Sequence, residues 1–429
     1  MKNAMKIGKN FWRYKLILLF LLSLNYIFGF FIFLYSVYGN KSIVYALMAA
    51  AQGSIIAIGL YTFLKAKIYR KEISLYFYMI VLFLFIYGLI GFLKGAKLLM
   101  LAREASYFLN PLAFISIGYY LATKYNIQFI LKNFFVSSFI LALFGIVETL
   151  ILPKNFFAKY YNTAIFYAEV IPIQSIYIPD ELFYAGNLPK FRFVPFITHR
   201  LISFFGEPTT AGVYFGFTLL VIIGSILYYR KFNKVNLFFL FVITLIATIL
   251  TQSRVALVTF FVGLVPLLNV YKKLSLNKIF LILFIFIIFI SFSTIEVFQL
   301  YLNHLLSSLT EEGGIEHKEP VKYFFSNLTN IDYFLGKGLV SEIVADAGWG
   351  LIYYRMGYLG LFIYLMFFLK IFMIMIKNHS EFLRKLGISI LCFTFVINFF
   401  NIYSGSFKSY NVIWALIGYS YYFSIKRWK

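Results

Sequence analysis

The sequence FRFVPFITHRLISFFGEPTTAGVYFGF, residues Phe191 to Phe217, joins a charged segment to the start of a hydrophobic helix. Its cluster of candidate functional groups consists of Arg192, His199, Arg200 and Glu207. Pro208 suits the first position of a helix, because the N–H that proline lacks would have no intrahelical partner there. Glu207 would then lie at the positive end of the helix dipole. We therefore predict a helix over 208–229 with ionisable side chains at its mouth.

The composition around this segment is that of a membrane protein. Hydrophobic residues make up 62% of the 429 residues and charged residues 13%, whereas soluble domains carry about a quarter charged residues. The single cysteine, Cys392, allows no disulfide within the chain. The basic N-terminus runs into an apolar segment of spanning length without a small-residue cleavage site, which favours a retained first span over a removed signal peptide.

Spanning helices need about 20 apolar residues, with a range of about 17 to 25. This length criterion predicts an all-α polytopic integral membrane protein with about 12 transmembrane helices. The predicted spans are 16–38, 42–64, 73–93, 106–122, 133–152, 208–229, 235–250, 255–270, 279–300, 348–369, 386–403 and 408–425. They predict a single transmembrane domain over 1–429, both termini cytoplasmic, and two long outer segments, 153–207 and 301–347.

The distribution of charge agrees with this topology. Segments predicted inside hold 24 of the 39 basic residues and two of the 16 acidic ones, which leaves +22 inside and +1 outside. Cytoplasmic loops are enriched in Lys and Arg, so the net charge of +23 indicates orientation. It does not indicate nucleic-acid binding, which would need a folded basic domain. The sequence GxxxxGK[ST] is absent, which argues against an ATP-driven pump.

A second candidate group follows the predicted helix 235–250, in the turn TQSRVAL with Gln252 and Arg254. The two flanking helices rise about 24 Å each against a hydrocarbon core of about 30 Å, so we expect this turn to be recessed. An arginine at such a depth costs at least about 2.5 kcal/mol unless it is paired or wet. The alternative is that Arg254 snorkels outward and ends the helix.

The second outer segment contains the remaining candidates. Asp346 fits the N-cap of the predicted helix 348–369, and Arg355 further along should face the bundle interior or a wet cavity rather than lipid. The acidic run Glu311 to Glu319 matches no metal-binding spacing, which favours a solvated loop and no metal site. Arginine donors match phosphate oxygens bidentately, so these clusters predict an outward-facing site for a phosphate-bearing, lipid-linked anion. The alternative is a capped helix with snorkelling arginines at the interface.

The order of these motifs resembles the O-antigen polymerase and O-antigen ligase superfamily. HRLISFFGEPTTAG precedes TQSRVAL, and FLGKGL precedes DAGWGLIYYRMGYLGLF, over residues 190–370. The resemblance implies a GT-C-like fold and a metal-independent inverting glycosyltransferase in the bacterial plasma membrane. Its active site would face the periplasm or exterior, and it would need no cofactor. The donor and acceptor would be undecaprenyl-pyrophosphate-linked oligosaccharides, with membrane lipids and a chain-length regulator protein as partners.

Residue roles follow from this resemblance. Arg200 matches the first-loop arginine, Arg254 the arginine of the Ser-Arg turn and Asp346 the polar position before the glycine-rich helix. We expect Arg192, Arg200, Arg254 and Arg355 to bind the pyrophosphate, Glu207 or Asp346 to act on the acceptor hydroxyl, and His199 and Gln252 to contact the acceptor. Ligases usually have a His-Asn pair where this chain has Asp346-Ala347, which favours the repeat-unit polymerase.

Three other functions stay open at this point. An O-antigen ligase would transfer the glycan to lipid A core sugar. A lipid-linked glycan flippase should carry charges along a through-path, whereas Glu148 and Glu296 both lie toward predicted outer ends. A structural membrane partner would have no cavity at the outer arginines.

Overall fold

A computed structural model describes residues 30–31, 33–96, 98–151, 201, 203–205, 208–229, 231–251, 253–268, 330–339, 348–400 and 411–425. All regular structure in these ranges is helical. The long helices are α2 (Lys41–Lys65), α3 (Ser74–Leu93), α4 (Leu98–Ala122), α5 (Ile127–Leu150), α9 (Pro208–Tyr228), α10 (Lys234–Leu250), α11 (Arg254–Leu268), α16 (Gly348–Ile376), α17 (Glu381–Phe400) and α18 (Asn411–Ile425). Three shorter ones are η1 (Ile68–Arg70), η3 (Ser203–Phe205) and α15 (Asn330–Leu335).

Asparagine begins three of these helices. The Asn40 side chain accepts hydrogen bonds from the first turn of α2, Asn126 from the amide of Phe129 in α5, and Asn233 from the amide of Val235 in α10. The first N–H groups of a helix have no intrahelical acceptor, so such a side chain satisfies them. Each asparagine therefore fixes where its apolar helix starts.

Five helices are long and apolar enough to cross a membrane within the described part of the chain: Lys41–Lys65, Ser74–Leu93, Ile127–Leu150, Thr209–Tyr228 and Ile352–Ile376. Two shorter apolar helices cover Lys234–Leu250 and Val255–Leu268. These lengths and compositions confirm a helical, multi-pass membrane protein. The count of twelve spans and the topology stay predictions, because span 279–300 and most of span 16–38 lie outside the described residues.

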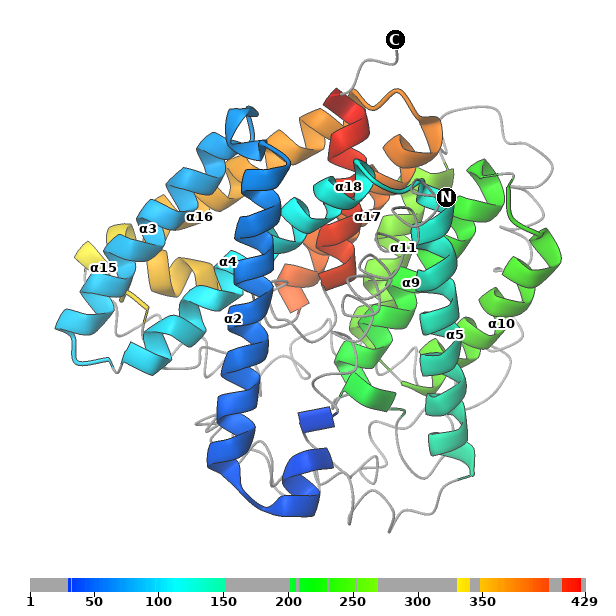
Figure 1. Ribbon diagram of the computed structural model, residues 1–429, viewed down its shortest axis with the longest axis horizontal. Coiled ribbons are helices and arrows are strands. Elements are labelled where there is room, and N and C mark those ends of the chain that lie inside the picture. Colours follow the sequence, from blue (N-terminus) through cyan, green and yellow to red (C-terminus); the bar gives the residue numbers. More distant parts are fainter. Residues whose placement is uncertain are drawn as a thin grey trace, which may run out of the picture.

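Burial separates a central helix from peripheral ones. Of the 18 residues that form the most apolar stretch of each helix, 89% are buried in α9, against 22% in α2 and 28% in α3. α9 packs against α10, α11 and α17, whereas α2 and α3 lie at one edge of the molecule (Figure 1). Their outer faces expose large apolar side chains such as Leu60, Leu64 and Phe85. A bilayer is the solvent that suits such faces.

Glycines allow α4 to pack closely against both α18 and α2. A Cβ at Gly118 of α4 would overlap the backbone of Ala415 in α18, and one at Gly418 would overlap the backbone of Ile115. Gly59 of α2 meets Ala113 of α4 in the same way. Small residues at crossings let backbones approach in membrane bundles, so α4 is held tightly between α2 and α18.

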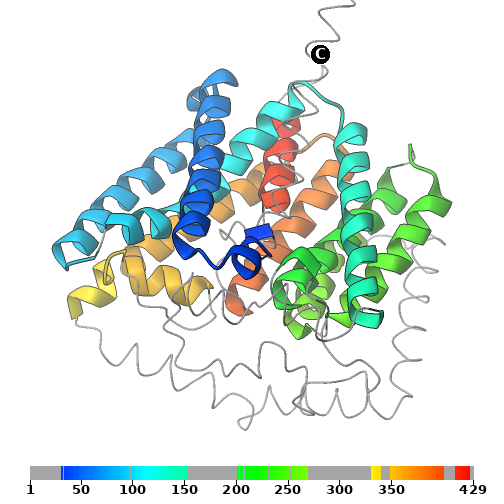
Figure 2. The same ribbon diagram turned by 60° about the horizontal axis from the view of Figure 1, so that its bottom comes forward.

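Helices joined by short turns run in opposite directions (Figure 1). The turn between α2 and α3, the turn between α16 and α17, and the end of α18 lie toward the top of Figure 1. The turn between α3 and α4 and the end of α5 lie toward the bottom, and the turned view keeps this separation (Figure 2). The upper turns carry Lys65, Lys67, Arg70, Lys71 and Lys377. The topology predicted from the sequence places these turns on the cytoplasmic side.

Candidate functional site

The structure describes the surroundings of the predicted site more fully than the site residues themselves. Arg192, His199, Arg200, Glu207, Gln252 and Asp346 lie outside the described residues. Arg254 is the first residue of α11, although its side chain also lies outside the description. Arg355 is described in full. The predicted start of the central helix at Pro208 is confirmed.

The residues that follow Arg200 form a buried segment, which we call the 201–205 segment and which comprises Leu201 and Ser203 to Phe205. Leu201, Ser203 and Phe205 are all buried. The Leu201 amide donates a hydrogen bond of 3.0 Å to the carbonyl of Leu250, the last residue of α10. Leu201 also lies over Gly145 of α5, where an added Cβ would come within 2.8 Å of its side chain.

A buried glutamate of α5 holds the middle of this segment. Glu148 is fully buried, and its Oε2 accepts a hydrogen bond of 2.6 Å from the Ser203 amide. The Ser203 hydroxyl donates to the carbonyl of Leu141 at 3.1 Å. Ser203 has a φ of 51°, in the left-handed region that residues other than glycine seldom adopt. Two hydrogen bonds to α5 thus stabilise an unusual backbone conformation three residues after Arg200.

The start of α9 meets the turn that precedes Arg254. A Cβ at Gly212 would lie 2.6 Å from the Ser253 Cβ and 2.7 Å from the Thr251 Oγ1, so only glycine allows this approach. Thr251 and Ser253 are buried in the bundle, whereas the recession of this turn below the membrane surface stays a prediction. The Ser253 hydroxyl accepts from the Ala256 amide at 3.3 Å and caps α11. The residues that follow Arg200 and the turn that precedes Arg254 therefore pack near one another, beside the start of α9.

The FLGKGL sequence docks onto a kink in α16. Gly357 has a φ of 60° and a ψ of −163°, which breaks the helical hydrogen bonding of the preceding turn. The Lys337 amide donates to the Tyr354 carbonyl at 2.8 Å and the Gly338 amide to the Arg355 carbonyl at 3.0 Å. The Tyr87 hydroxyl donates to the carbonyl of Met356 at 2.9 Å. The carbonyls that lose their helical partners at the kink thus accept hydrogen bonds from other segments.

Arg355 lies two residues before Gly357 and forms an ion pair with Glu104 of α4. Both side chains are buried, which confirms that Arg355 faces the interior. The arginine Nε and Nη1 have no hydrogen-bond partner among the described residues. Glu104 was not among the predicted site residues, because the predicted span began at residue 106. The helix α4 begins at Leu98 and includes this glutamate. A buried arginine needs a counter-ion, and that need was the available signal.

A second ionic group holds α15 beside the α3–α4 turn. Asp332 lies 3.5 Å from the Lys94 ammonium and 3.3 Å from the Lys337 ammonium. Lys94 also donates to the Lys337 carbonyl at 3.1 Å. The Leu339 amide donates to the Tyr87 carbonyl at 3.1 Å. These contacts join the GKGL sequence to α3 as well as to α16.

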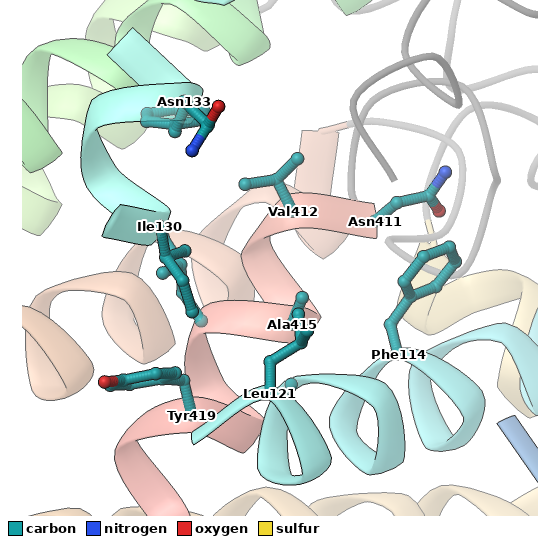
Figure 3. A pocket seen from close by; sticks show the side chains of 11 residues that line it. Phe114, Leu121, Ile130, Asn133, Asn411, Val412, Ala415 and Tyr419 are labelled. Atoms are coloured by element: carbon teal, nitrogen blue, oxygen red, sulfur yellow. The ribbon is translucent and has the colours of Figure 1, made fainter. Parts of the chain in front are cut away.

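The described helices also enclose an apolar pocket away from these ionic groups. It lies between α4, α5 and α18, has a volume of about 40 Å³ and includes Phe114, Leu121, Ile130 and Ala415 among its lining residues (Figure 3). None of the described residues that line it is charged. It therefore offers no charged side chain to bind a phosphate. Among the described residues, no cluster of three or more His, Cys, Asp or Glu could hold a metal ion.

No known protein family matches the chain, and no curated protein matches its sequence significantly.

Proposed function

We propose that this chain is a membrane-embedded polysaccharide polymerase. It would join undecaprenyl-pyrophosphate-linked oligosaccharide repeat units into O-antigen or capsular polysaccharide by inverting glycosyl transfer on the outer face of the bacterial plasma membrane. The proposal rests on the resemblance of four ordered motifs in residues 190–370 and on the packing of the residues beside them.

One structural observation carries the proposal furthest. The 201–205 segment is bonded to the end of α10, and the turn at Thr251 and Ser253 packs against Gly212 of α9. Arg200 is one peptide bond from Leu201, and Arg254 is one peptide bond from Ser253. Two arginines that are distant in sequence are thus attached to one packed unit, which is what a shared phosphate site requires.

Arg200 and Arg254 would bind the pyrophosphate of the donor. Guanidinium groups present planar, permanently charged donors that match phosphate oxygens. As the glycosidic bond breaks, negative charge grows on the leaving pyrophosphate, and fixed cations stabilise it most at that point. Arg192 would supply a further positive charge to this site. Arg355 has Nε and Nη1 donors without partners in the described part of the chain and is a further candidate.

The acceptor hydroxyl would attack the anomeric carbon of the donor from the face opposite the pyrophosphate. A new bond forms between that oxygen and the anomeric carbon, and the bond from the carbon to the pyrophosphate oxygen breaks. The hydroxyl proton passes to Glu207 or Asp346 acting as general base. Undecaprenyl pyrophosphate leaves, with His199 and Gln252 contacting the acceptor sugar. The reaction uses no covalent sugar–enzyme bond and no metal.

Cells that lack the chain test the proposal. Loss of a polymerase predicts that single lipid-linked repeat units accumulate on the outer face of the membrane and that polymer disappears. Loss of a ligase would instead leave finished, unattached polymer, and loss of a flippase would leave single repeats on the inner face. Accumulation of either of these last two products would refute the proposed polymerase. Restoring the wild-type chain should restore the polymer and serves as the control.

A further inference from the structure

Glu148 has no role in the proposed chemistry, although it is a carboxylate buried at the end of an apolar helix. Burying an ionisable group is costly unless hydrogen bonds compensate, so such groups in spanning helices usually have a function. One of its oxygens accepts a hydrogen bond of 2.6 Å from the Ser203 amide. That contact is made to the backbone of the 201–205 segment, which directly follows Arg200 in the sequence.

The contacts around Glu148 define where this segment can lie. At one end of the segment, the Leu201 amide donates a hydrogen bond to the Leu250 carbonyl, and the Leu201 side chain packs over Gly145. Ser203 is fixed by Glu148 and by the bond from its hydroxyl to Leu141. The left-handed φ of Ser203 is costly for a residue with a Cβ, so the surrounding bonds must maintain it.

We infer that Glu148 is a positioning residue that sets the place of Arg200 by fixing the backbone of the 201–205 segment. Glu148 does this as a hydrogen-bond acceptor, through the oxygen that takes the Ser203 amide. The structural part of the inference stands on the contacts above, and its consequence for catalysis rests on the proposed function.

The catalytic consequence is tested with purified protein and lipid-linked repeat units as substrate. Glu148→Ala should lower kcat/KM by about 10- to 100-fold, because a displacement of about 1 Å in a binding group can cost a hundredfold. Glu148→Gln keeps an oxygen for the Ser203 amide and should stay within about threefold of wild type. Thr149→Val is the matched control, since the Thr149 hydroxyl bonds within its own helix to Gly145. An equal loss in Glu148→Gln and Glu148→Ala would refute the role of the acceptor oxygen.

The positioning itself is tested without any activity assay. Cysteines replace Gly145 and Leu201 in a Cys392→Ser background, and disulfide formation is followed by the loss of thiols that react with a maleimide mass tag. The disulfide should form readily with Glu148 or Glu148→Gln and at least about fivefold more slowly with Glu148→Ala, as loss of one buried hydrogen bond predicts.

The two assays separate the two claims. Equal disulfide rates with Glu148 and Glu148→Ala would overturn the positioning role, whatever the activity. A slower rate with unchanged kcat/KM would overturn its link to catalysis. If the wild-type protein makes no polymer, the proposed function fails, while the disulfide rates still decide whether Glu148 positions the segment.

Discussion

Arg355 of α16 and Glu104 of α4 form an ion pair in the interior of the helical bundle. The two residues are far apart in the sequence, and each would be costly in an apolar span without the other. α4 and α16 both pack against α3 and α18. The pair therefore links α4 and α16 by electrostatic attraction.

Removing one member of this pair should destabilise the protein strongly. Glu104→Ala and Arg355→Met each leave one buried charge without its partner, which costs about 3 to 5 kcal/mol in buried pairs. The double variant Glu104→Leu/Arg355→Met removes both charges and should recover most of that loss. Unfolding midpoints in detergent measure the effect.

The exposed pair between Lys370 and Glu72 is the matched control for this prediction. Its atoms lie 2.6 Å apart, and the hydrogen bond from Lys370 lowers the pKa of Glu72. Solvent screens such a pair, so Glu72→Ala should cost less than about 1 kcal/mol. Equal effects of Glu104→Ala and Glu72→Ala would contradict a special role for the buried pair.

The kink at Gly357 should accept only glycine. Its backbone angles belong to a region that is open almost solely to glycine, and a Cβ would overlap the carbonyl of Phe334. We expect Gly357→Ala to lower stability by at least about 1 to 3 kcal/mol. Gly53→Ala in α2 is the control, because nothing lies within 4 Å of its Cβ and alanine favours a helix. A neutral Gly357→Ala would show that the kink is not needed.

Tyr87 should stabilise the kink through its hydroxyl. Tyr87→Phe removes the donor to the Met356 carbonyl and leaves a buried acceptor without this bond, which costs about 1 to 3 kcal/mol. Tyr78→Phe on the exposed face of the same helix should change stability by less than about 0.5 kcal/mol. The difference in unfolding midpoint between the two variants measures the contribution. Indistinguishable midpoints would remove the hydroxyl from the account of the kink.

The crossing of α4 and α18 should depend on its glycines. Gly118→Leu places a side chain against the backbone of Ala415 and should separate the two helices. We expect loss of most folded, monodisperse protein on size-exclusion chromatography, because overpacking at a backbone contact cannot be relieved by a rotamer change. Gly88→Leu in α3 has open space at its Cβ and should behave as wild type. Normal yield of Gly118→Leu would contradict the close crossing.

The sequence predicts the bounds of two apolar helices to within one residue. The prediction of 42–64 became α2 at Lys41–Lys65, and 208–229 became α9 at Pro208–Tyr228. The prediction of 106–122 began too late, because Glu104 interrupts the hydropathy of α4 and its partner lies on a distant helix. The prediction of 348–369 ended too early, since α16 continues to Ile376.

The site was predictable in part. The sequence indicated Pro208 as a helix start and an inward-facing Arg355, and the structure agrees at both. The recession of the turn at Ser253 below the membrane surface stays a prediction. The Glu148 contact and the kink at Gly357 were not predictable, because both depend on segments that meet only after folding. The roles of Arg200, Arg254, Glu207 and Asp346 stay predictions.

The reaction of the purified protein tests the central claim most directly. Lipid-linked repeat units isolated from cells that lack the chain serve as substrate, and the length of the glycan is read on gels. Wild type should extend them, while Arg200→Ala and Arg254→Ala should each slow extension by at least about a hundredfold, as loss of a group that stabilises developing charge predicts. Arg384→Ala, at the opposite end of the bundle near the start of α17, should match wild type. Extension at the wild-type rate by both Arg200→Ala and Arg254→Ala would contradict the proposed mechanism, and no extension by the wild type would contradict the proposed function.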